Sequence, residues 1–237
     1  MIYAARSIVG KRAVNEDTVY LPRKGEMSLV IVADGMGGHA AGDIASALAV
    51  ETIVAELKRG GPGGPVALMT NAVNRANTAV YEYSKSDKGL AGMGTTVVAA
   101  LLFSSRFIVA NVGDSRLYHC DGETLAQVTI DHSYVSELVR LGYITKEEAA
   151  RHPRRNLITR ALGTRPVERA DIFEVEWRGG DRILLCSDGL YGVLQDKELL
   201  CALRGRSDTG LICDALVEMA ETAGSNDNIS AVIVEND

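Results

Sequence analysis

The feature that most constrains the fold is an apolar run that ends in a carboxylate, LVIVADGMGGHAAGD at residues 29–43. The segment LVIVA is rich in β-branched residues, which predicts a strand buried on both faces. The pair Asp34-Gly35 is expected to end this strand, and a glycine-rich loop carrying His39 leads to a helix that begins near Asp43. A lone Asp-Gly pair is most often a plain turn, so the rest of the chain decides whether Asp34 has a chemical role.

Length, composition and charge are those of an ordinary globular protein. The 237 residues suffice for one large domain with a substantial core or for two small ones. Hydrophobic residues make up 46% and charged residues 24%, and a net charge of −6 without any basic run argues against a nucleic-acid partner. The sequence has neither a signal-peptide core nor an apolar run of membrane-spanning length. We therefore expect a soluble, cytoplasmic protein with no membrane partner.

Cysteine and histidine spacing does not indicate a disulfide framework or a zinc site. The chain has no CxxC pair and no HxxxH pair. We expect His132 and His152 on the surface or in the segment 131–165, and His119 in a strand. The cysteines are expected to be reduced core residues, namely Cys120, Cys186, Cys201 and Cys213.

Apolar periodicity predicts strands in runs, with helices between the runs. Helices are predicted at 43–58, 66–84 and 209–223, and residues 131–165 contain short helical patterns typical of an insertion. Because the strands cluster instead of alternating singly with helices, the pattern favours a layered α+β sandwich over a doubly wound parallel sheet. Asp121-Gly122 marks a plain hairpin turn. Strands are predicted at 2–9, 17–21, 28–33, 97–103, 107–112, 171–177, 181–187 and 229–234.

Carboxylates stand at the ends of these predicted strands. Asp34 follows LVIVA, Asp114 follows FIVANVG, and Asp188 follows ILLCS. Asp227 precedes NISAVIV and Asp17 precedes TVYL. If the strands are neighbours in a sheet, the acids converge on one end of it. At about 4 Å two such charges repel by about 4 kcal/mol at an effective dielectric constant of 20, so the acids either pair with Lys or Arg or hold cations.

Divalent cations of the magnesium type fit this set of acids best. Arg12 and Arg116 could neutralise only part of the charge. Oxygen ligands are those that Mg²⁺ and Mn²⁺ prefer, whereas zinc would want His or Cys and calcium a DxDxDG loop. Two such ions can acidify a water and clamp an in-line displacement at phosphorus. A plainer interpretation of Asp17 and Asp114, as strand-end caps, stays open.

Other phosphate chemistries lack their motifs. The chain has no GxxxxGK[ST] phosphate-binding loop, no C-x5-R loop with a thiolate nucleophile, and no DxDxT pattern. By elimination, the nucleophile is expected to be a metal-activated water instead of a side chain.

Six short motifs occur in series along nearly the whole chain. They are RAVNED (12–17), VADGMGGH (32–39), GMGTT (92–96), VGDSR (112–116), CSDGL (186–190) and DNIS (227–230). Together they resemble the type 2C protein phosphatases, the metal-dependent Ser/Thr phosphatase family, in its compact bacterial form. The segment 131–165 resembles the helical flap of bacterial members.

The resemblance implies an αββα sandwich, in which two central, mostly antiparallel sheets are flanked by helix pairs, with the flap as an insertion. The whole chain, 1–237, would be a single catalytic domain. A binuclear Mn²⁺ or Mg²⁺ centre is implied, with Asp34 bridging the ions, Glu16 reached through water, and Asp114 at a third-metal position shared with Asp188. The implied ligands are Asp17, Asp34, the carbonyl of Gly35, Asp114, Asp188 and Asp227.

The resemblance also implies two residues that act on the substrate. Arg12 matches the arginine that holds the substrate phosphate, where a planar guanidinium suits a bidentate contact. His39 is a candidate general acid, although Met-Gly-Gly separates it from Asp34-Gly35 and animal members have a histidine directly after the Asp-Gly pair. Alternatively His39 shapes the loop, and water protonates the leaving group.

The function implied is that of a protein Ser/Thr phosphatase in signalling, which acts as a monomer on phosphorylated proteins and opposes a Ser/Thr kinase. One alternative is a regulatory phosphatase that serves an anti-anti-sigma factor. Such phosphatases usually carry a sensor domain, and we expect 237 residues to leave no room for one. Another is a catalytically silent phosphoprotein-binding scaffold, in which some of the acids should be lost.

Overall fold

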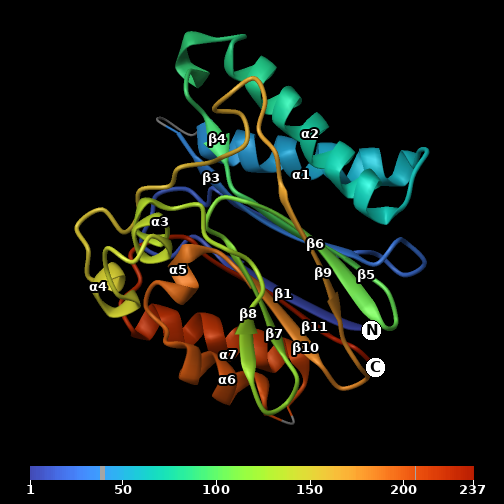
Figure 1. Cartoon of the computed structure of the whole chain (residues 1–237), viewed down its shortest axis with the longest axis vertical. Helices are drawn as coiled ribbons and strands as arrows, with labels where there is room; N and C mark the ends of the chain where they lie inside the picture. The colour runs from blue at the N-terminus through green and yellow to red at the C-terminus, as the bar shows by residue number, and fades with distance from the viewer. Residues whose placement is uncertain (38–40, 206) are drawn as a thin grey trace.

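Two antiparallel β-sheets pack face to face between layers of helices (Figure 1). The structure is a computed structural model and describes residues 1–37, 41–205 and 207–237. The predicted α+β sandwich with antiparallel sheets and outer helix pairs is confirmed.

The first sheet has the strand order β1-β11-β10-β7-β8, and every neighbouring pair is antiparallel. The two ends of the chain lie together at one end of this sheet (Figure 1), because β1 and β11 pair over their whole length. Its strands are β1 (Ile2–Ile8), β7 (Arg116–Cys120), β8 (Leu125–Gln127), β10 (Arg182–Cys186) and β11 (Ile229–Glu235).

The second sheet has the order β2-β3-β5-β6-β9 and is also antiparallel, with the short strand β4 paired to the end of β3. Its strands are β2 (Asp17–Tyr20), β3 (Leu29–Met36), β4 (Gly94–Thr95), β5 (Val97–Leu102), β6 (Arg106–Val112) and β9 (Asp171–Glu176).

Helix pairs cover the outer face of each sheet. The pair α1 (Ala41–Arg59) and α2 (Pro65–Ser84) packs on the second sheet, and the GGPGGP segment joins the two helices as predicted. The pair α6 (Asp196–Leu203) and α7 (Thr209–Thr222) packs on the first sheet together with the short helix α5 (Asp188–Tyr191). None of the described helices is both long and apolar enough to span a bilayer.

The core has three layers because successive strand residues point to opposite faces. In β3, Leu29 and Ile31 pack against α1 and α2, whereas Val30 and Val32 pack against the other sheet. In β11, Val232 belongs to the same layer between the sheets. Burial of one such side chain stabilises the fold by about 1.5–3 kcal/mol, so the continuous apolar runs are explained by strands buried on both faces.

The strand β3 does not end at Asp34-Gly35 as predicted but continues to Met36. Strand β4 supplies the partner, since Gly35 is opposite Thr95 and Met36 is opposite Gly94. A sequence pattern does not reveal this pairing, because the two segments are about sixty residues apart. Asp34 is therefore held inside a paired strand.

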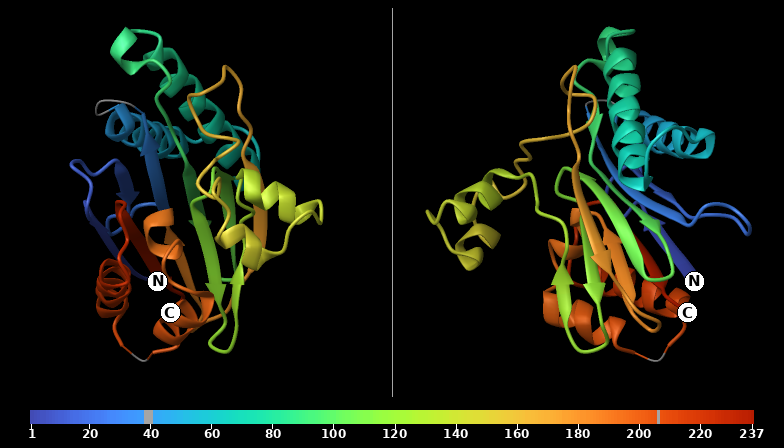
Figure 2. Two further views of the ribbon diagram at one scale, coloured as in Figure 1. Left: turned by 90° about the vertical axis from the view of Figure 1, so that its left-hand side faces the viewer. Right: turned by 45° about the vertical axis from the view of Figure 1, so that its right-hand side comes forward.

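The flap carries two short helices, α3 (Tyr134–Arg140) and α4 (Lys146–Ala150). Outside the flap, a 3₁₀ turn, η1 (Lys88–Leu90), follows α2. Both flap helices stand to one side of the sheets in the right-hand view of Figure 2, where they are yellow. Side chains define where they begin, because Ser133 and Thr145 accept hydrogen bonds from backbone N–H groups of the first turn.

His132 lies in the segment 131–165, one of its two predicted places, and it is buried there, with 8% of its surface exposed, because it packs under the loop that follows β6. One prediction about a single side chain is wrong. Cys201 is exposed on α6, because Leu199 and Leu203 occupy the face of that helix that meets the core. The other cysteines are buried, and His119 lies in β7 as expected.

We expect the layer between the sheets to carry much of the stability. Val232→Ala should lower the free energy of unfolding by about 2 kcal/mol, because it removes apolar volume from a closed layer. Val167→Ala is the matched control, because Val167 is 71% exposed and should change stability by less than about 0.5 kcal/mol. Urea unfolding in EDTA measures both, and equal losses would contradict this account.

Candidate active site

The acids predicted at strand ends gather at one end of the sandwich, where the strands terminate, and the chain termini lie at the opposite end. Asp17 begins β2 and lies directly opposite Asp34 of β3. Asp188 follows β10 and Asp227 precedes β11, and these two strands are antiparallel neighbours, so both acids lie at the same edge. Asp114 follows the end of β6. The topology thus brings together all the acids that the sequence singled out.

Burial and mutual repulsion disfavour the charged form of these acids. Burial raises the pKa of Asp34 well above its usual value, and the nearby charges of Asp17 and Asp188 add to the effect. Burial raises the pKa of Asp17 to about 6, against hydrogen bonds from serine side chains that lower it. Burial, followed by the charge of Asp188, raises the pKa of Asp114 to about 7. The ionised forms of these carboxyls are therefore energetically unfavourable in the metal-free site.

Unpaired carboxylate oxygens fit a cation site. In the described part of the chain only three buried side-chain polar atoms lack a hydrogen-bond partner, and two are Asp17 Oδ1 and Asp188 Oδ1. Such orphaned atoms are rare in folded proteins. Among the described residues no three His, Cys, Asp or Glu side chains already stand in a metal-binding group. The fit to Mg²⁺ or Mn²⁺ therefore rests on charge, burial and an all-oxygen donor set.

Threonine side chains hold the backbone of Asp34. The Asp34 N–H donates to Thr96 Oγ1 at 2.9 Å, and Thr95 Oγ1 donates to the Asp34 carbonyl at 2.9 Å. Thr96 Oγ1 is also 2.7 Å from Ser115 Oγ, beside Asp114. The strand that carries Asp34 and the loop that carries Asp114 are therefore linked beneath the site, and both threonines lie within the motif GMGTT.

Gly35 is required by close packing. A Cβ atom at this position would lie 2.0 Å from the carbonyl oxygen of Gly42, at the start of α1, and 2.7 Å from that of Glu16. The Gly35 N–H donates to the Glu16 carbonyl at 3.0 Å. The glycine thus lets the acidic strand, the start of α1 and the Glu16 segment meet.

Arg12 lies at the rim of the acidic site. Its Nη2 donates to Asp227 Oδ2 at 2.7 Å, and 53% of its side chain is exposed. The hydrogen bond to Asp227 raises the pKa of the guanidinium, so Arg12 keeps its charge. The structure therefore brings Arg12 to the acids, as the sequence predicts.

Arg116 does not neutralise the site acids directly. Its Nε and Nη2 donate to Asp131 at 3.0 and 2.7 Å, and its guanidinium stacks over the ring of Tyr191 at 3.6 Å. Because Asp131 begins the flap and Tyr191 belongs to α5, this cation ties the base of the flap to the helix that starts with Asp188. Sequence analysis gave no signal for Asp131 or Tyr191 in this role.

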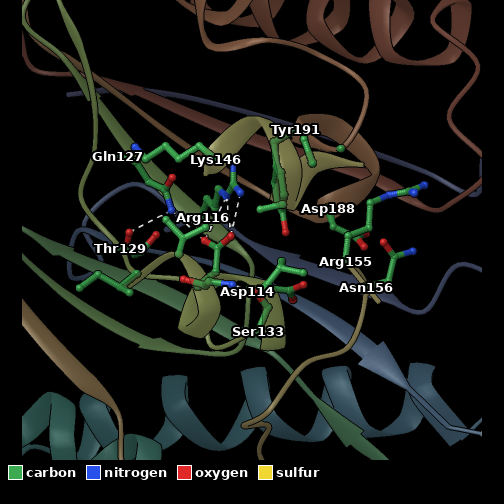
Figure 3. A pocket seen from close by; sticks show the side chains of 18 of the residues that line it. Asp114, Arg116, Gln127, Thr129, Ser133, Lys146, Arg155, Asn156, Asp188 and Tyr191 are labelled. Carbon is green, nitrogen blue, oxygen red and sulfur yellow. Dashed lines mark hydrogen bonds and ion pairs between the residues drawn. The ribbon is translucent and has the colours of Figure 1, made fainter. Parts of the chain in front are cut away.

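A cavity of about 570 Å³ separates the acids from the flap (Figure 3). Asp114 and Asp188 line one side of it. Lys146 and Arg155 from the flap region, with Asn156, line another part. The cavity is open enough to admit a side chain or a short peptide segment, with acids and bases on its walls.

His132 supports the loop that carries Asp114. The Gly113 N–H donates to its Nδ1 at 3.0 Å, and its Nε2 is 3.1 Å from Asp171 Oδ2. Burial lowers the pKa of His132, which agrees with Nδ1 acting as an acceptor. His39, the other histidine singled out by sequence, lies outside the described residues.

Serine and asparagine side chains complete the support of the site. Ser187 Oγ donates to Asp17 Oδ2 at 2.8 Å, although Ser187 directly follows β10 of the first sheet and Asp17 begins β2 of the second. Asn228 bonds to the segment that carries Arg12. The sequence alone did not reveal these roles. The only sign of them was that Ser187 lies in the motif CSDGL and Asn228 in the motif DNIS.

Comparisons with known proteins point to one family. The family model described as Protein phosphatase 2C matches residues 6–232. The serine/threonine phosphatase stp of Listeria monocytogenes is 40% identical over 223 residues, which are 90% of this chain and 86% of that protein.

Solved structures agree with this similarity. The crystal structure of serine/threonine phosphatase Stp1 from Staphylococcus aureus superposes with a TM-score of 0.93 at 32% identity, covering 99% of this chain and 95% of that one. The catalytic domain of serine threonine protein phosphatase PstP in complex with two manganese ions superposes with a TM-score of 0.88 at 38% identity, covering 98% and 96%.

The repulsion in the site predicts a pH-dependent gain of stability on removing one charge. Asp114 has a raised pKa in the folded protein, so its contribution to stability is lost as the pH rises through about 7. In metal-free protein Asp114→Asn should therefore be more stabilising at pH 8 than at pH 5, by about 2 kcal/mol. Urea unfolding in EDTA at the two pH values measures the difference.

The matched control is Asp214→Asn, on the solvent side of α7 and outside the site. An equal gain from this control would contradict burial as the cause, and so would a gain from Asp114→Asn that is the same at both pH values.

Proposed function

The chain belongs to the protein phosphatase 2C family, and we propose that its acidic site hydrolyses phosphoserine and phosphothreonine in proteins. The observation that carries the proposal is the convergence of five acids, with Asp17 and Asp114 buried and the others half-buried, beside one exposed arginine. Relatives that cover most of the chain are named serine/threonine phosphatases. A silent binding scaffold would have no need for acids whose charge is so costly to bury.

Two Mn²⁺ or Mg²⁺ ions are proposed as the cofactor. Asp17, Asp34, the carbonyl of Gly35, Asp188 and Asp227 would hold them, and Asp114 with Asp188 would hold a third ion. When bound, such ions lower the pKa of a water and offset negative charge on a phosphoryl group. The orphaned oxygens and the two manganese ions of the related PstP structure support this assignment.

Arg12 is proposed to bind the substrate phosphate. A planar guanidinium can donate two parallel hydrogen bonds to phosphate oxygens. The half-exposed position at the rim leaves it accessible to a ligand, and its present partner Asp227 keeps it close to the acids. His39 keeps its interpretation as a candidate proton donor on sequence grounds alone.

The flap, residues 131–165, is proposed to face the protein substrate. The cavity beside Asp114 and Asp188 extends to Lys146 and Arg155, so chain segments next to a phosphoresidue would contact the flap. Mixed charge on the cavity walls suits a polypeptide better than an apolar small molecule.

The proposed substrate fixes the class of reaction that supplies it, because phosphoserine and phosphothreonine are made by Ser/Thr kinases.

We propose that 1–237 works as one catalytic domain and as a monomer, since a single chain provides every site residue and one core layer joins both sheets. The cytoplasm is proposed as its compartment, supported by four free cysteines.

Removal of cations should abolish the activity. With Mn²⁺ the protein should release phosphate from a phosphothreonine peptide, and EDTA should stop the release. Asp34→Ala and Asp188→Ala should each lower kcat/KM by about a thousandfold or more, since the ions supply several kcal/mol of charge stabilisation.

The matched control for these variants is Asp121→Ala. Asp121 also precedes a glycine, but this Asp-Gly pair forms the exposed hairpin turn between β7 and β8. It should leave kcat/KM within about twofold. Activity that survives EDTA, or that survives either site substitution, would contradict the proposed function.

Arg12→Lys tests the phosphate contact. The variant keeps the charge but loses the bidentate geometry, so KM for the phosphopeptide should rise by about tenfold with a smaller change in kcat. Arg23→Lys in the loop before β3 is the control. An unchanged KM would rule out a direct contact between Arg12 and phosphate.

A further inference from the structure

The side chain of Asn228 ties together the segment that carries Arg12. Its Nδ2 donates to the carbonyls of Val9 and Val14, both at 2.9 Å. Its Oδ1 accepts a hydrogen bond from the Glu16 N–H at 2.9 Å. Only 4% of Asn228 is exposed. One buried amide therefore uses both of its donors and its acceptor on a single segment.

These bonds define the shape of the segment between β1 and β2. Val9 and Val14 lie on either side of Arg12, so the amide of Asn228 draws the two ends of a short loop together with Arg12 between them. The Arg12 N–H donates to the Val9 carbonyl at 3.3 Å, which tightens the same loop. Loss of the amide donors would leave the Val14 carbonyl without this partner and the Val9 carbonyl with only the Arg12 N–H, so the loop would be held less tightly.

Asp227 and Asn228 hold the arginine segment in two different ways. Asp227 Oδ2 accepts from the Arg12 guanidinium, whereas Asp227 Oδ1 accepts from the Asn228 N–H at 2.9 Å. The ion pair depends on where the Arg12 side chain points. The bonds from Asn228 reach only the backbone, so they persist when the guanidinium turns from Asp227 to another anion.

We propose that Asn228 is a positioning residue that holds Arg12 over the acidic edge, ready to bind phosphate. The proposal rests on the proposed function of Arg12. Asn228 acts through the loop backbone and does not contact the substrate. A preformed loop lowers the entropy lost when the arginine engages its ligand, so the loss of Asn228 should weaken phosphate binding.

The chain contains a matched clamp for comparison. Asn77 of α2 donates through Nδ2 to the carbonyls of Arg165 and Pro166, both at 3.2 Å, and its Oδ1 accepts from the Gly163 N–H at 2.9 Å. Asn77 is as buried as Asn228, with 1% exposed. It performs the same structural task at the far end of the flap, on a loop that carries neither Arg12 nor any of the proposed metal ligands.

The test compares Asn228→Ala and Asn77→Ala in the manganese-saturated protein. Inorganic phosphate serves as a competitive inhibitor, and its Ki is measured along with kcat, KM, the Mn²⁺ dependence and thermal stability. Both variants should lose stability. Asn228→Ala should raise the Ki of phosphate and KM by about tenfold with little change in Mn²⁺ dependence, whereas Asn77→Ala should leave the Ki within about twofold.

A double-mutant cycle separates positioning from general damage. In an Arg12→Ala background, Asn228→Ala should raise the Ki no further. An equal effect in both backgrounds, an equal effect from Asn77→Ala, or a loss confined to Mn²⁺ dependence would each overturn the proposal. Asn228→Asp keeps the shape and the acceptor but loses the donors, so it serves if the alanine variant does not fold. Failure of the proposed function itself would appear separately, as a wild-type protein that releases no phosphate.

Discussion

The structure depends on a balance between a large apolar core and a group of acids that repel one another at its edge. Asp17, Asp34 and Asp188 are buried where their charged forms are disfavoured. Strand pairing keeps them there, because each acid is attached to a strand whose other residues fill the core. Folding of the metal-free chain therefore works against this repulsion, and bound cations would remove it. Stability and cofactor binding are thus expected to be linked through the same side chains.

The site belongs to both sheets, so it exists only when they pack in one register. Asp17 and Asp34 come from the second sheet, and Asp188 and Asp227 flank strands of the first. The hydrogen bond from Ser187 to Asp17 crosses between the sheets within this edge. Side chains such as Val232 set the spacing of the sheets in the middle of the molecule. Core packing and site geometry are therefore coupled through the strands that carry both.

The sequence allows the strands and the acids to be predicted because both signals are local. An apolar run of β-branched residues needs a buried strand wherever it lies, and a carboxylate at its end is visible at once. The extension of β3 to Met36 was not predictable, because it depends on β4, some sixty residues away. The burial of His132 and the pairing of Arg116 with Asp131 depend equally on distant partners. Other supporting residues, such as Ser187 and Asn228, lie inside the motifs, but a motif does not say which of its members contact which.

Three Asp-Gly pairs in the chain show why neighbours decide the chemistry of a dipeptide. A Cβ on Gly35 would lie 2.0 Å from the carbonyl of Gly42, and one on Gly189 would lie 1.9 Å from that of Asn228, whereas nothing lies within 4 Å of a Cβ on Gly122. The first two glycines allow another segment to close over the acid, and burial then raises the acid's pKa. Asp121 stays in solvent, where hydrogen bonds from the backbone N–H groups of Thr124 and Glu123 lower its pKa to about 2. The same two residues therefore form a turn when exposed, and place an acid with a raised pKa when a second backbone packs on the glycine.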